Sequence, residues 1–368
     1  MKSIELKKFL KFCVGFVIPI IILGAIELIL PLGYFSPEAW GSLNAYTRTG
    51  RILLPGPFYP NMSITKNEPG DLGMHSAYSN FKEVNWVTNN EGYRTSLSSD
   101  RKYDVIIIGD SMAVGSGMKQ EDTPAEVLSR LIHKDVYGMG AILMSDFIHE
   151  GYIEKYKPKF VVLIQTERTL NITDTYSVVY HQTILSKSRD FVQKIIHKFG
   201  FENFDPIFVL ADRFLKQNML HYLKSKILYS IEDKSVIKSD NSPMLFLQGD
   251  VALKEIPKSE VVTVAGKIKD LDIFLKERGV TLIIVPVPNK ESIYWELFNN
   301  NKQSHFVTDL VTALRERSVT SVDTYSAFRN ATYKENKILY PTDNVHWNEE
   351  GVIETMNLLV PLINKNIK

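Results

Sequence analysis

The sequence predicts an α/β protein in which helices cover both faces of a parallel β-sheet, with a transmembrane helix before it and a helical insertion within it. Three observations support this. An apolar segment lies near the N-terminus, β-branched runs alternate with helical segments after residue 100, and this alternation stops between residues 171 and 250. A chain of 368 residues can form one main domain and still carry both additions.

The first element is the apolar segment, which runs from Phe9 to Leu32. About 20 such residues cross a bilayer as a helix. Three lysines precede the segment and Lys11 lies near its start, which predicts a cytoplasmic N-terminus and an extracytoplasmic remainder, either periplasmic or extracellular. A cleaved signal peptide is the alternative, but its apolar region is usually shorter and ends in a small-x-small site, which is poorly matched here. We therefore expect residues 1–33 to form a cytoplasmic flank and an uncleaved anchor.

The next segment, residues 34–100, is rich in proline, glycine, asparagine, serine and aromatic residues and has no long periodic run. This composition is typical of irregular structure with short strands. We expect it to be a lead-in to the main domain.

The main domain is predicted from 101 to 368, where short apolar runs suited to buried strands recur. They are residues 103–108, 160–164, 280–285 and 319–322. A segment with helical spacing, residues 123–133, follows the first run. Strands and helices in alternation imply a parallel sheet.

Residues 171–250 interrupt this alternation with aromatic and basic residues at helical spacing, as in Phe191, Ile195 and Phe199. We expect a helical insertion. It forms either a cap packed over the sheet edge or a lid or docking surface near the membrane.

The composition excludes several classes of function. The chain has 43 Lys and Arg against 42 Asp and Glu, so a formal charge of +1 gives no electrostatic reason to expect a nucleic-acid partner. The single cysteine, Cys13, lies in the apolar segment, and the eight histidines show no metal-binding spacing. We expect neither a metal nor a cofactor.

The first candidate catalytic residue is Ser111, which directly follows the strand 106–108 in the glycine-rich turn 109–115. Reactive residues of parallel α/β sheets lie just beyond the carboxyl ends of strands. At the start of a helix, the Ser111 amide and the helix dipole can stabilise an oxyanion. The alternative is that Asp110 and Ser111 only cap a helix.

A second constellation, Asp343 and His346, lies near the C-terminus in residues 340–351. A serine hydroxyl needs a base to take its proton, and the imidazole of that base needs a carboxylate to fix its tautomer. Ser111, His346 and Asp343 together predict a nucleophile, its base and the supporting carboxylate. Taken separately, His346 would be a loop histidine and Asp343 a turn residue.

These motifs resemble the SGNH or GDSL-like hydrolases, which have a Gly-Asp-Ser nucleophile and a C-terminal Asp-x-x-His. The resemblance extends from Val87 to the end and implies a three-layer, flavodoxin-like sheet. Residues 89–94 resemble the Asn-x-x-Gly-Phe/Tyr-Arg lead-in of many such proteins, for which we expect a structural role.

The resemblance also implies an oxyanion hole, for which the family supplies a glycine and an asparagine. Gly140 matches the glycine, whereas residues 165–168 hold no asparagine. An ionised carboxylate at Glu167 cannot donate a hydrogen bond to an oxyanion. Gln165 or Arg168 substitutes for the asparagine, or Glu167 simply holds Arg168 in an ion pair.

The pair at 167–168 and residues 285–294 resemble the AlgX/AlgJ-type proteins, extracytoplasmic enzymes that O-acetylate polysaccharides and carry a Pro-x-Pro-x-Lys segment that leads to a tyrosine. Their histidine often follows the aspartate by two residues, whereas His346 follows Asp343 by three. Lys290 is then either a ligand for an acidic sugar or carboxylate, or a solvated loop residue.

The function expected from these features is acyl transfer, with acetyl the expected group. Ser111 takes the acyl group from a donor, and a hydroxyl of a cell-envelope or exported glycan receives it. The implied donor partner is a membrane-embedded O-acyltransferase, contacted near Glu27 and the insertion. Two alternatives stay open: a carbohydrate or lipid esterase with the same residues, and a non-catalytic protein that binds glycans or organises an assembly.

Overall fold

The computed structural model describes residues 2–30, 36, 38–43, 56–73, 78–170, 176, 191, 223, 236–239, 242–251, 256–297 and 303–365. Most of the insertion expected at 171–250 lies outside these residues.

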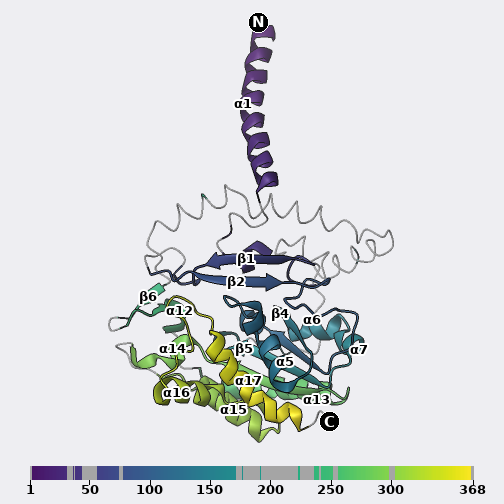
Figure 1. Ribbon diagram of the computed structural model, residues 1–368, viewed down its shortest axis with the longest axis vertical. Helices are drawn as coiled ribbons and strands as arrows, with labels where there is room; N and C mark the ends of the chain where they lie inside the picture. The colour runs from purple at the N-terminus through teal and green to yellow at the C-terminus, as the bar shows by residue number, and fades with distance from the viewer. Residues whose placement is uncertain are drawn as a thin grey trace.

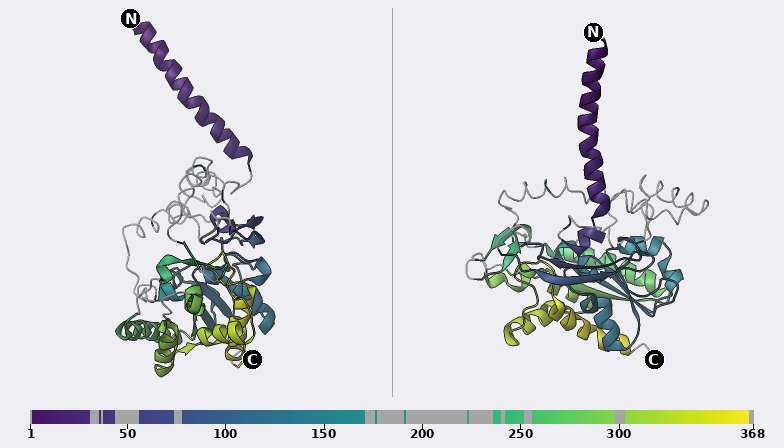
Figure 2. Two further views of the ribbon diagram at one scale, coloured as in Figure 1. Left: turned by 90° about the vertical axis from the view of Figure 1, so that its left-hand side faces the viewer. Right: turned by 45° about the horizontal axis from the view of Figure 1, so that its top comes forward.

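The N-terminal helix α1 (Lys2–Ile29) stands away from the rest of the described chain (Figures 1 and 2). Its segment Lys7–Ile26 has a mean hydropathy of 2.5 and is not buried against the protein. By length and composition this helix can cross a membrane, a property that signal sequences share.

The centre of the protein is a sheet of five parallel strands, in the spatial order β4, β3, β5, β8, β9. Their bounds are β3 Val105–Gly109, β4 Val136–Gly140, β5 Phe160–Thr166, β8 Thr281–Val287 and β9 Thr320–Ser321. Counted along the chain this is the order 2-1-3-4-5 of flavodoxin-like folds. The parallel α/β fold predicted from the sequence is confirmed.

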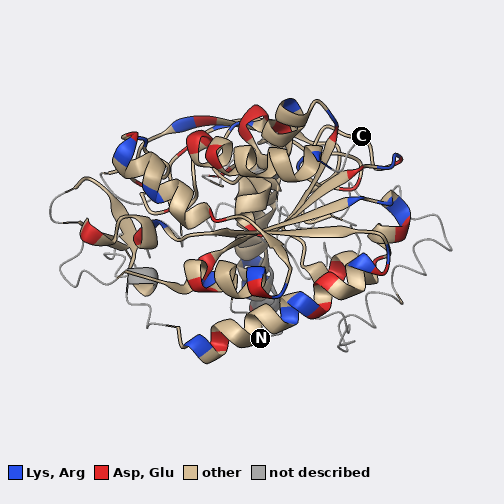
Figure 3. Ribbon diagram, turned by 90° about the horizontal axis from the view of Figure 1, so that it is seen from below, with Lys and Arg blue, Asp and Glu red and all other residues tan. Residues whose placement is uncertain are grey.

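Side chains of the strands alternate between two cores, one on each face of the sheet. Ile107 and Val162 point into the first core, whereas Ile106 and Val161 point into the second. The first core is closed by α5 (Pro124–Ile132), α16 (Thr324–Lys334) and α17 (Glu349–Asn364), and the second by α6 (Met144–His149), α7 (Tyr152–Tyr156) and α13 (Lys258–Lys276). The helix α15 (Phe306–Glu316) contributes to both cores. Charges of both signs are interspersed on the outer surfaces of the helices (Figure 3).

The lead-in forms a small layer between α1 and the main sheet (Figure 1). It contains α2 (Ala39–Leu43) and an antiparallel pair, β1 (Ser63–Glu68) and β2 (Lys82–Val87). An aromatic cluster holds it together, with Phe58 packed edge to face on Trp40 at 5.2 Å and on Trp86 at 5.0 Å between ring centroids. The short strands expected here are present.

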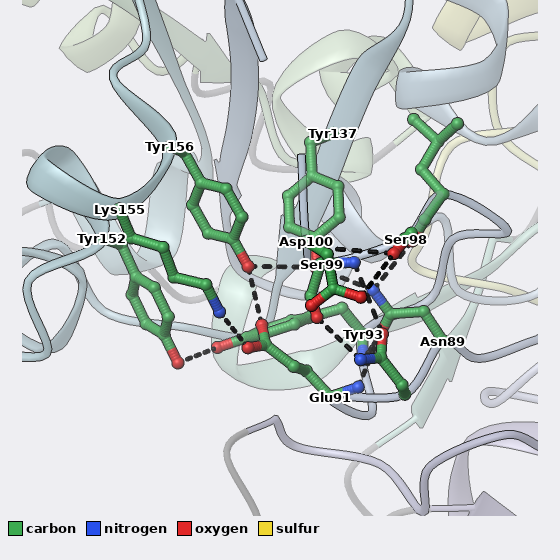
Figure 4. Close-up of polar contacts among 12 residues, drawn as sticks. Asn89, Glu91, Tyr93, Ser98, Ser99, Asp100, Tyr137, Tyr152, Lys155 and Tyr156 are labelled. Atoms are coloured by element: carbon green, nitrogen blue, oxygen red, sulfur yellow. Dashed lines mark hydrogen bonds and ion pairs between the residues drawn. The ribbon is translucent and has the colours of Figure 1, made fainter. Parts of the chain in front are cut away.

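The turn that follows β2 is fastened to the main domain by a polar cluster (Figure 4). Asn89 Oδ1 accepts hydrogen bonds from the amides of Glu91 and Tyr93, while its Nδ2 donates to the Tyr137 hydroxyl at 2.7 Å. The Tyr156 hydroxyl donates to Glu91 at 2.7 Å. These contacts fix the lead-in against β4 and α7.

The described end of the expected insertion contains a β-hairpin, β6 (Val236–Lys238) with β7 (Leu245–Leu247), followed by the short helix α12 (Gln248–Val251). The amide of Leu245 donates to the carbonyl of Thr342 at 2.7 Å, so the hairpin contacts the segment that leads to His346. The sequence predicted helix throughout this range.

Candidate active site

Ser111 is the first residue of the short helix α4 (Ser111–Val114), immediately after β3. Gly109 makes this turn possible because it has φ 142°, and a Cβ atom there would overlap the carbonyl oxygen of Ile164. Asp110 is the N-cap of the helix, since its Oδ1 accepts from the Met112 amide at 2.9 Å. The side chain of Asp110 therefore caps the helix, and the Ser111 hydroxyl contacts His346 instead.

Asp110 also joins the ends of β3 and β5. Its Oδ2 accepts from the amide and the hydroxyl of Thr166, at 2.8 and 2.7 Å, and from the Thr169 hydroxyl at 3.2 Å. The turn that carries Ser111 thus lies where the direction of strand succession reverses, which is the usual place for a site in such sheets.

Arg94 holds the other end of α4. Its buried guanidinium donates to the carbonyls of Gly115, Met118 (2.7 Å) and Asn85 (2.9 Å) and stacks over the Trp86 ring at 4.0 Å. Burial lowers the pKa of Arg94 to about 9, which leaves it charged at neutral pH. The lead-in arginine therefore has the positioning contacts expected of a structural residue.

The Ser111 hydroxyl is 2.8 Å from Nε2 of His346. On the other side of the ring, Asn344 Oδ1 accepts from the His346 amide at 2.9 Å, and His346 Nδ1 lies 2.9 Å from that same oxygen. Because an amide oxygen can only accept hydrogen bonds, Nδ1 must carry its hydrogen to form this bond. Nε2 then has a free lone pair, which is the form that accepts the serine proton.

The carboxylate beside His346 Nδ1 is that of Asp71, whose Oδ2 lies 3.5 Å away. Oδ1 of Asp71 accepts from the Val345 amide at 3.0 Å. Asp343, which the sequence placed in this role, is buried and accepts from the amides of Gly70 (3.0 Å) and Asn80 (2.7 Å) through Oδ2. The structure thus brings Ser111 and His346 together and directs Asp343 toward the lead-in loop.

Electrostatics favour a neutral imidazole. Burial lowers the pKa of His346 below its usual value of 6.5, and the positive charge of Arg168 lowers it further, while the nearby Asp71 carboxylate raises it. A neutral histidine next to a serine hydroxyl is the state needed for a general base at pH 7.

Lys290 is 1% exposed and is neither a solvated residue nor open to a ligand. Its ammonium group donates to the carbonyls of Pro341 (2.6 Å), Thr342 (3.0 Å) and Asn344 (3.2 Å), which uses its three hydrogens. Burial lowers its pKa to about 8. Lys290 therefore fixes the segment that carries His346.

Glu167 fastens the segment that contains Lys290. Its buried carboxylate accepts from the Asn289 amide (2.9 Å) and from the hydroxyls of Ser292 (2.6 Å) and Ser304. These contacts join the end of β5 to α14 (Lys290–Ile293). A carboxylate with three donors is a stable anchor.

The remaining predicted residues have different surroundings. Gly140 ends β4, where a Cβ atom would come within 2.6 Å of the Val114 amide nitrogen, so the glycine allows close packing on α4. Both ends of the Gln165 amide are engaged, because Nε2 donates to Thr169 O at 3.0 Å and Oε1 accepts from the Tyr176 hydroxyl at 3.1 Å. Arg168 is half-buried and close enough to affect the His346 pKa.

Two residues of the site, Asp71 and Asn344, were not predicted from the sequence. Asn344 lies inside the Asp-x-x-His motif, where its contact with the histidine ring depends on the fold of the turn. Asp71 lies in the segment Gly70–Gly73, whose glycines indicate only a turn. Within the described ranges, no group of three or more His, Cys, Asp or Glu side chains is placed to hold a metal ion.

Similarity to known structures is distant. A proposed acylhydrolase of Bacteroides fragilis is 14% identical, with a TM-score of 0.34, over 73% of this chain and 88% of that one. A GDSL-like lipase of Bacteroides thetaiotaomicron is 12% identical, with a TM-score of 0.32, over 73% of this chain and 90% of that one. No curated protein is significantly similar in sequence.

The family comparison is more specific. Residues 245–356 match the family described as the SGNH hydrolase-like domain of the acetyltransferase AlgX. The matched range includes Lys290, Asp343 and His346, and it ends within α17. This part of the chain therefore resembles the SGNH hydrolase-like domain of the AlgX type, the resemblance that the sequence motifs indicated.

Proposed function

We propose that this protein is a membrane-anchored, extracytoplasmic O-acyltransferase that transfers an acetyl group to a cell-envelope or exported polysaccharide. The observation that carries the proposal is the 2.8 Å contact between Ser111 Oγ and His346 Nε2, with Nδ1 held in its protonated form by Asn344. The AlgX-type match over residues 245–356 supports acetyl as the group transferred.

In the proposed mechanism, Ser111 Oγ attacks the carbonyl carbon of an acyl donor while His346 Nε2 takes the hydroxyl proton. The tetrahedral intermediate then collapses, the bond to the donor oxygen breaks, and His346 returns the proton to the leaving group. The hydroxyl of a glycan attacks the acyl-serine in the second half, with His346 again taking and returning a proton. Ser111 is regenerated and the ester is moved to the glycan.

Stabilisation of the oxyanion is assigned to groups around the nucleophile. The Ser111 amide begins α4, and the end of β4 at Gly140 packs on the same helix. We assign the positive charge of Arg168 to the same task, or to binding an acidic part of the glycan, because Lys290 is fully used by the 341–344 carbonyls.

The helix α1 supports a membrane location for the protein, and the lysines in its first turns support a cytoplasmic N-terminus. An acyl donor for a polysaccharide outside the cytoplasm has to cross the bilayer. We therefore propose a membrane-embedded O-acyltransferase as the partner that supplies the acyl group, with Glu27 and residues 171–250 as the region of contact.

The first experiment tests for an activated nucleophile. The full-length protein, purified in detergent, is treated with a fluorophosphonate probe that reacts with activated serines. We expect labelling of the wild type and of Ser116→Ala, a serine in the same turn, but not of Ser111→Ala. Absence of labelling in the folded wild type would refute the enzyme and favour a glycan-binding or assembly role.

The second experiment separates transfer from hydrolysis. The same protein is incubated with a chromogenic acetyl ester, with and without candidate oligosaccharides, and the products are analysed by mass spectrometry. An acetylated oligosaccharide that depends on Ser111 supports the transferase. Free acetate as the sole product with every glycan would identify an esterase instead.

A further inference from the structure

We propose that Asp71, from the loop that follows β1, is the carboxylate that supports His346, and that Asp343 acts as a latch for the loop that carries Asp71. The inference rests on the proposed acyl transfer, and it assigns the third member of that site to a residue outside both the Gly-Asp-Ser turn and the Asp-x-x-His motif. Asp71 acts through His346 and is a positioning residue.

Asp71 lies beside the imidazole ring of His346. Asp71 Oδ2 lies 3.5 Å from His346 Nδ1, and its Oδ1 accepts from the Val345 amide at 3.0 Å. One carboxylate thus contacts both the imidazole and the backbone next to it. This places a negative charge beside Nδ1, where it stabilises a positively charged imidazole.

Asp343 contacts the lead-in loop and not the imidazole. Its Oδ2 accepts from Gly70 and Asn80, and its carbonyl oxygen accepts from the amides of Leu72 and Gly73, both at 3.0 Å. A Cβ atom at Gly73 would come within 2.8 Å of the Cβ of Asp343, so these glycines are needed for the close approach. Asp343 therefore holds the two ends of the loop in which Asp71 lies.

The charges around His346 also favour Asp71 as its supporting carboxylate. The charged groups that act on His346 are Asp71 and Asp110, which raise its pKa, and Arg168 and Lys82, which lower it. Asp71 is the largest of these influences, and Asp343 is not among them. The negative charge of Asp343 instead favours the ammonium form of Lys290.

In this site, two side chains take the two roles that a single aspartate usually has in a catalytic triad. Asn344 accepts the Nδ1 hydrogen and fixes the tautomer, whereas Asp71 supplies the negative charge. When the proton of Ser111 moves to Nε2, the ring becomes an imidazolium, and the Asp71 carboxylate stabilises it. The lead-in is then part of the catalytic centre.

The test compares Asp71→Asn, Asp71→Glu and Asp343→Asn in the full-length protein in detergent. The titration of His346 is read from the pH dependence of hydrogen exchange at its ring C2 position, measured by mass spectrometry on a peptide of residues 340–350, which contains no other histidine. This readout needs no enzymatic activity. The rate of fluorophosphonate labelling of Ser111 is measured over the same pH range.

For Asp71→Asn we expect the His346 titration, and with it the acid limb of the labelling rate, to move to lower pH, because the charge that raises the pKa is removed. The plateau rate should fall roughly 10- to 100-fold, less than the about 10⁴-fold loss when an aspartate alone holds the tautomer. Asp71→Glu keeps the negative charge, so it should return the acid limb of the labelling rate to the pH range of the wild type. Asp343→Asn should lower thermal stability and leave the titration of His346 in place.

Two results would overturn the inference: an unmoved His346 titration in Asp71→Asn, or a shift in Asp343→Asn equal to the one expected for Asp71→Asn. If Asp343→Asn does not fold, the comparison of Asp71→Asn with Asp71→Glu decides alone. A wild type that shows the predicted titration but no labelling would refute the proposed acyl transfer and leave the assignment of Asp71 standing.

Discussion

Replacement of Lys290 by methionine tests whether a buried ammonium group holds the segment that carries His346. The change keeps most of the side-chain volume and removes three hydrogen bonds to carbonyls. A hydrogen bond to a charged group contributes about 1.5–3 kcal/mol, but relief of the buried charge offsets part of the loss. Thr342 O also keeps the amide of Leu245 as a donor.

We therefore expect a net loss of about 2–3 kcal/mol in the free energy of unfolding, which lowers Tm by about 4–12 °C for a domain of this size. Differential scanning calorimetry of the full-length protein measures this value, and fluorophosphonate labelling of Ser111 should slow because His346 is less well placed. Lys159→Met is the matched control, since Lys159 is exposed and pairs with Asp104, so its loss should change stability by less than about 0.5 kcal/mol. A Lys290→Met protein that melts and reacts like the wild type would refute the positioning role.

The remaining predictions concern the turn, the anchor and the pH profile. Gly109→Ala should prevent stable folding or lower the free energy of unfolding by more than about 3 kcal/mol in chemical denaturation, because the added Cβ overlaps a carbonyl of β5. The control Gly266→Ala, in α13, places its Cβ where no atom lies within 4 Å and should be neutral or stabilising. Equal effects of the two substitutions would contradict the steric explanation. Glu167→Gln should lose about 1–3 kcal/mol, since an amide cannot accept from all three donors; an unchanged denaturation midpoint would count against it. Labelling of Ser111 should rise with pH and reach half its maximum below pH 6.5, because burial lowers the pKa of His346 and the neutral ring is the base; a midpoint above 6.5 would contradict this.

Much of the fold could be predicted because the central strands carry a local signal. The runs that form β3, β5 and β8 are β-branched and bounded by turn residues, and each was expected from the sequence. The strand β4 has the sequence Val136–Gly140 and was not expected as a strand. Its glycines make room for neighbouring elements, since a Cβ at Gly138 would come within 3.1 Å of the Ala125 side chain. Close packing, and not strand propensity, therefore explains why this strand contains glycines.

The residues of the site also differ in whether the sequence could predict them. Ser111 and His346 could be proposed because each lies in a recognisable turn at the end of a strand or before a helix. Asp71 could not, because it meets Val345 across 274 positions of sequence, and nothing local indicates that contact. Lys290 was open to a binding role because the sequence does not show that three carbonyls surround its ammonium group.

The long sequence separations within the site have a consequence for the order of folding. Ser111 meets His346 across 235 positions, and the segment with His346 lies near the end of the chain. Contacts of such long range form late, after the local helices and the first strand pairs. We therefore expect the Ser111 hydroxyl to lack its proposed base until the segment with His346 has docked on the sheet. The proposed acyl transfer thus depends on a contact that forms only when the fold is complete.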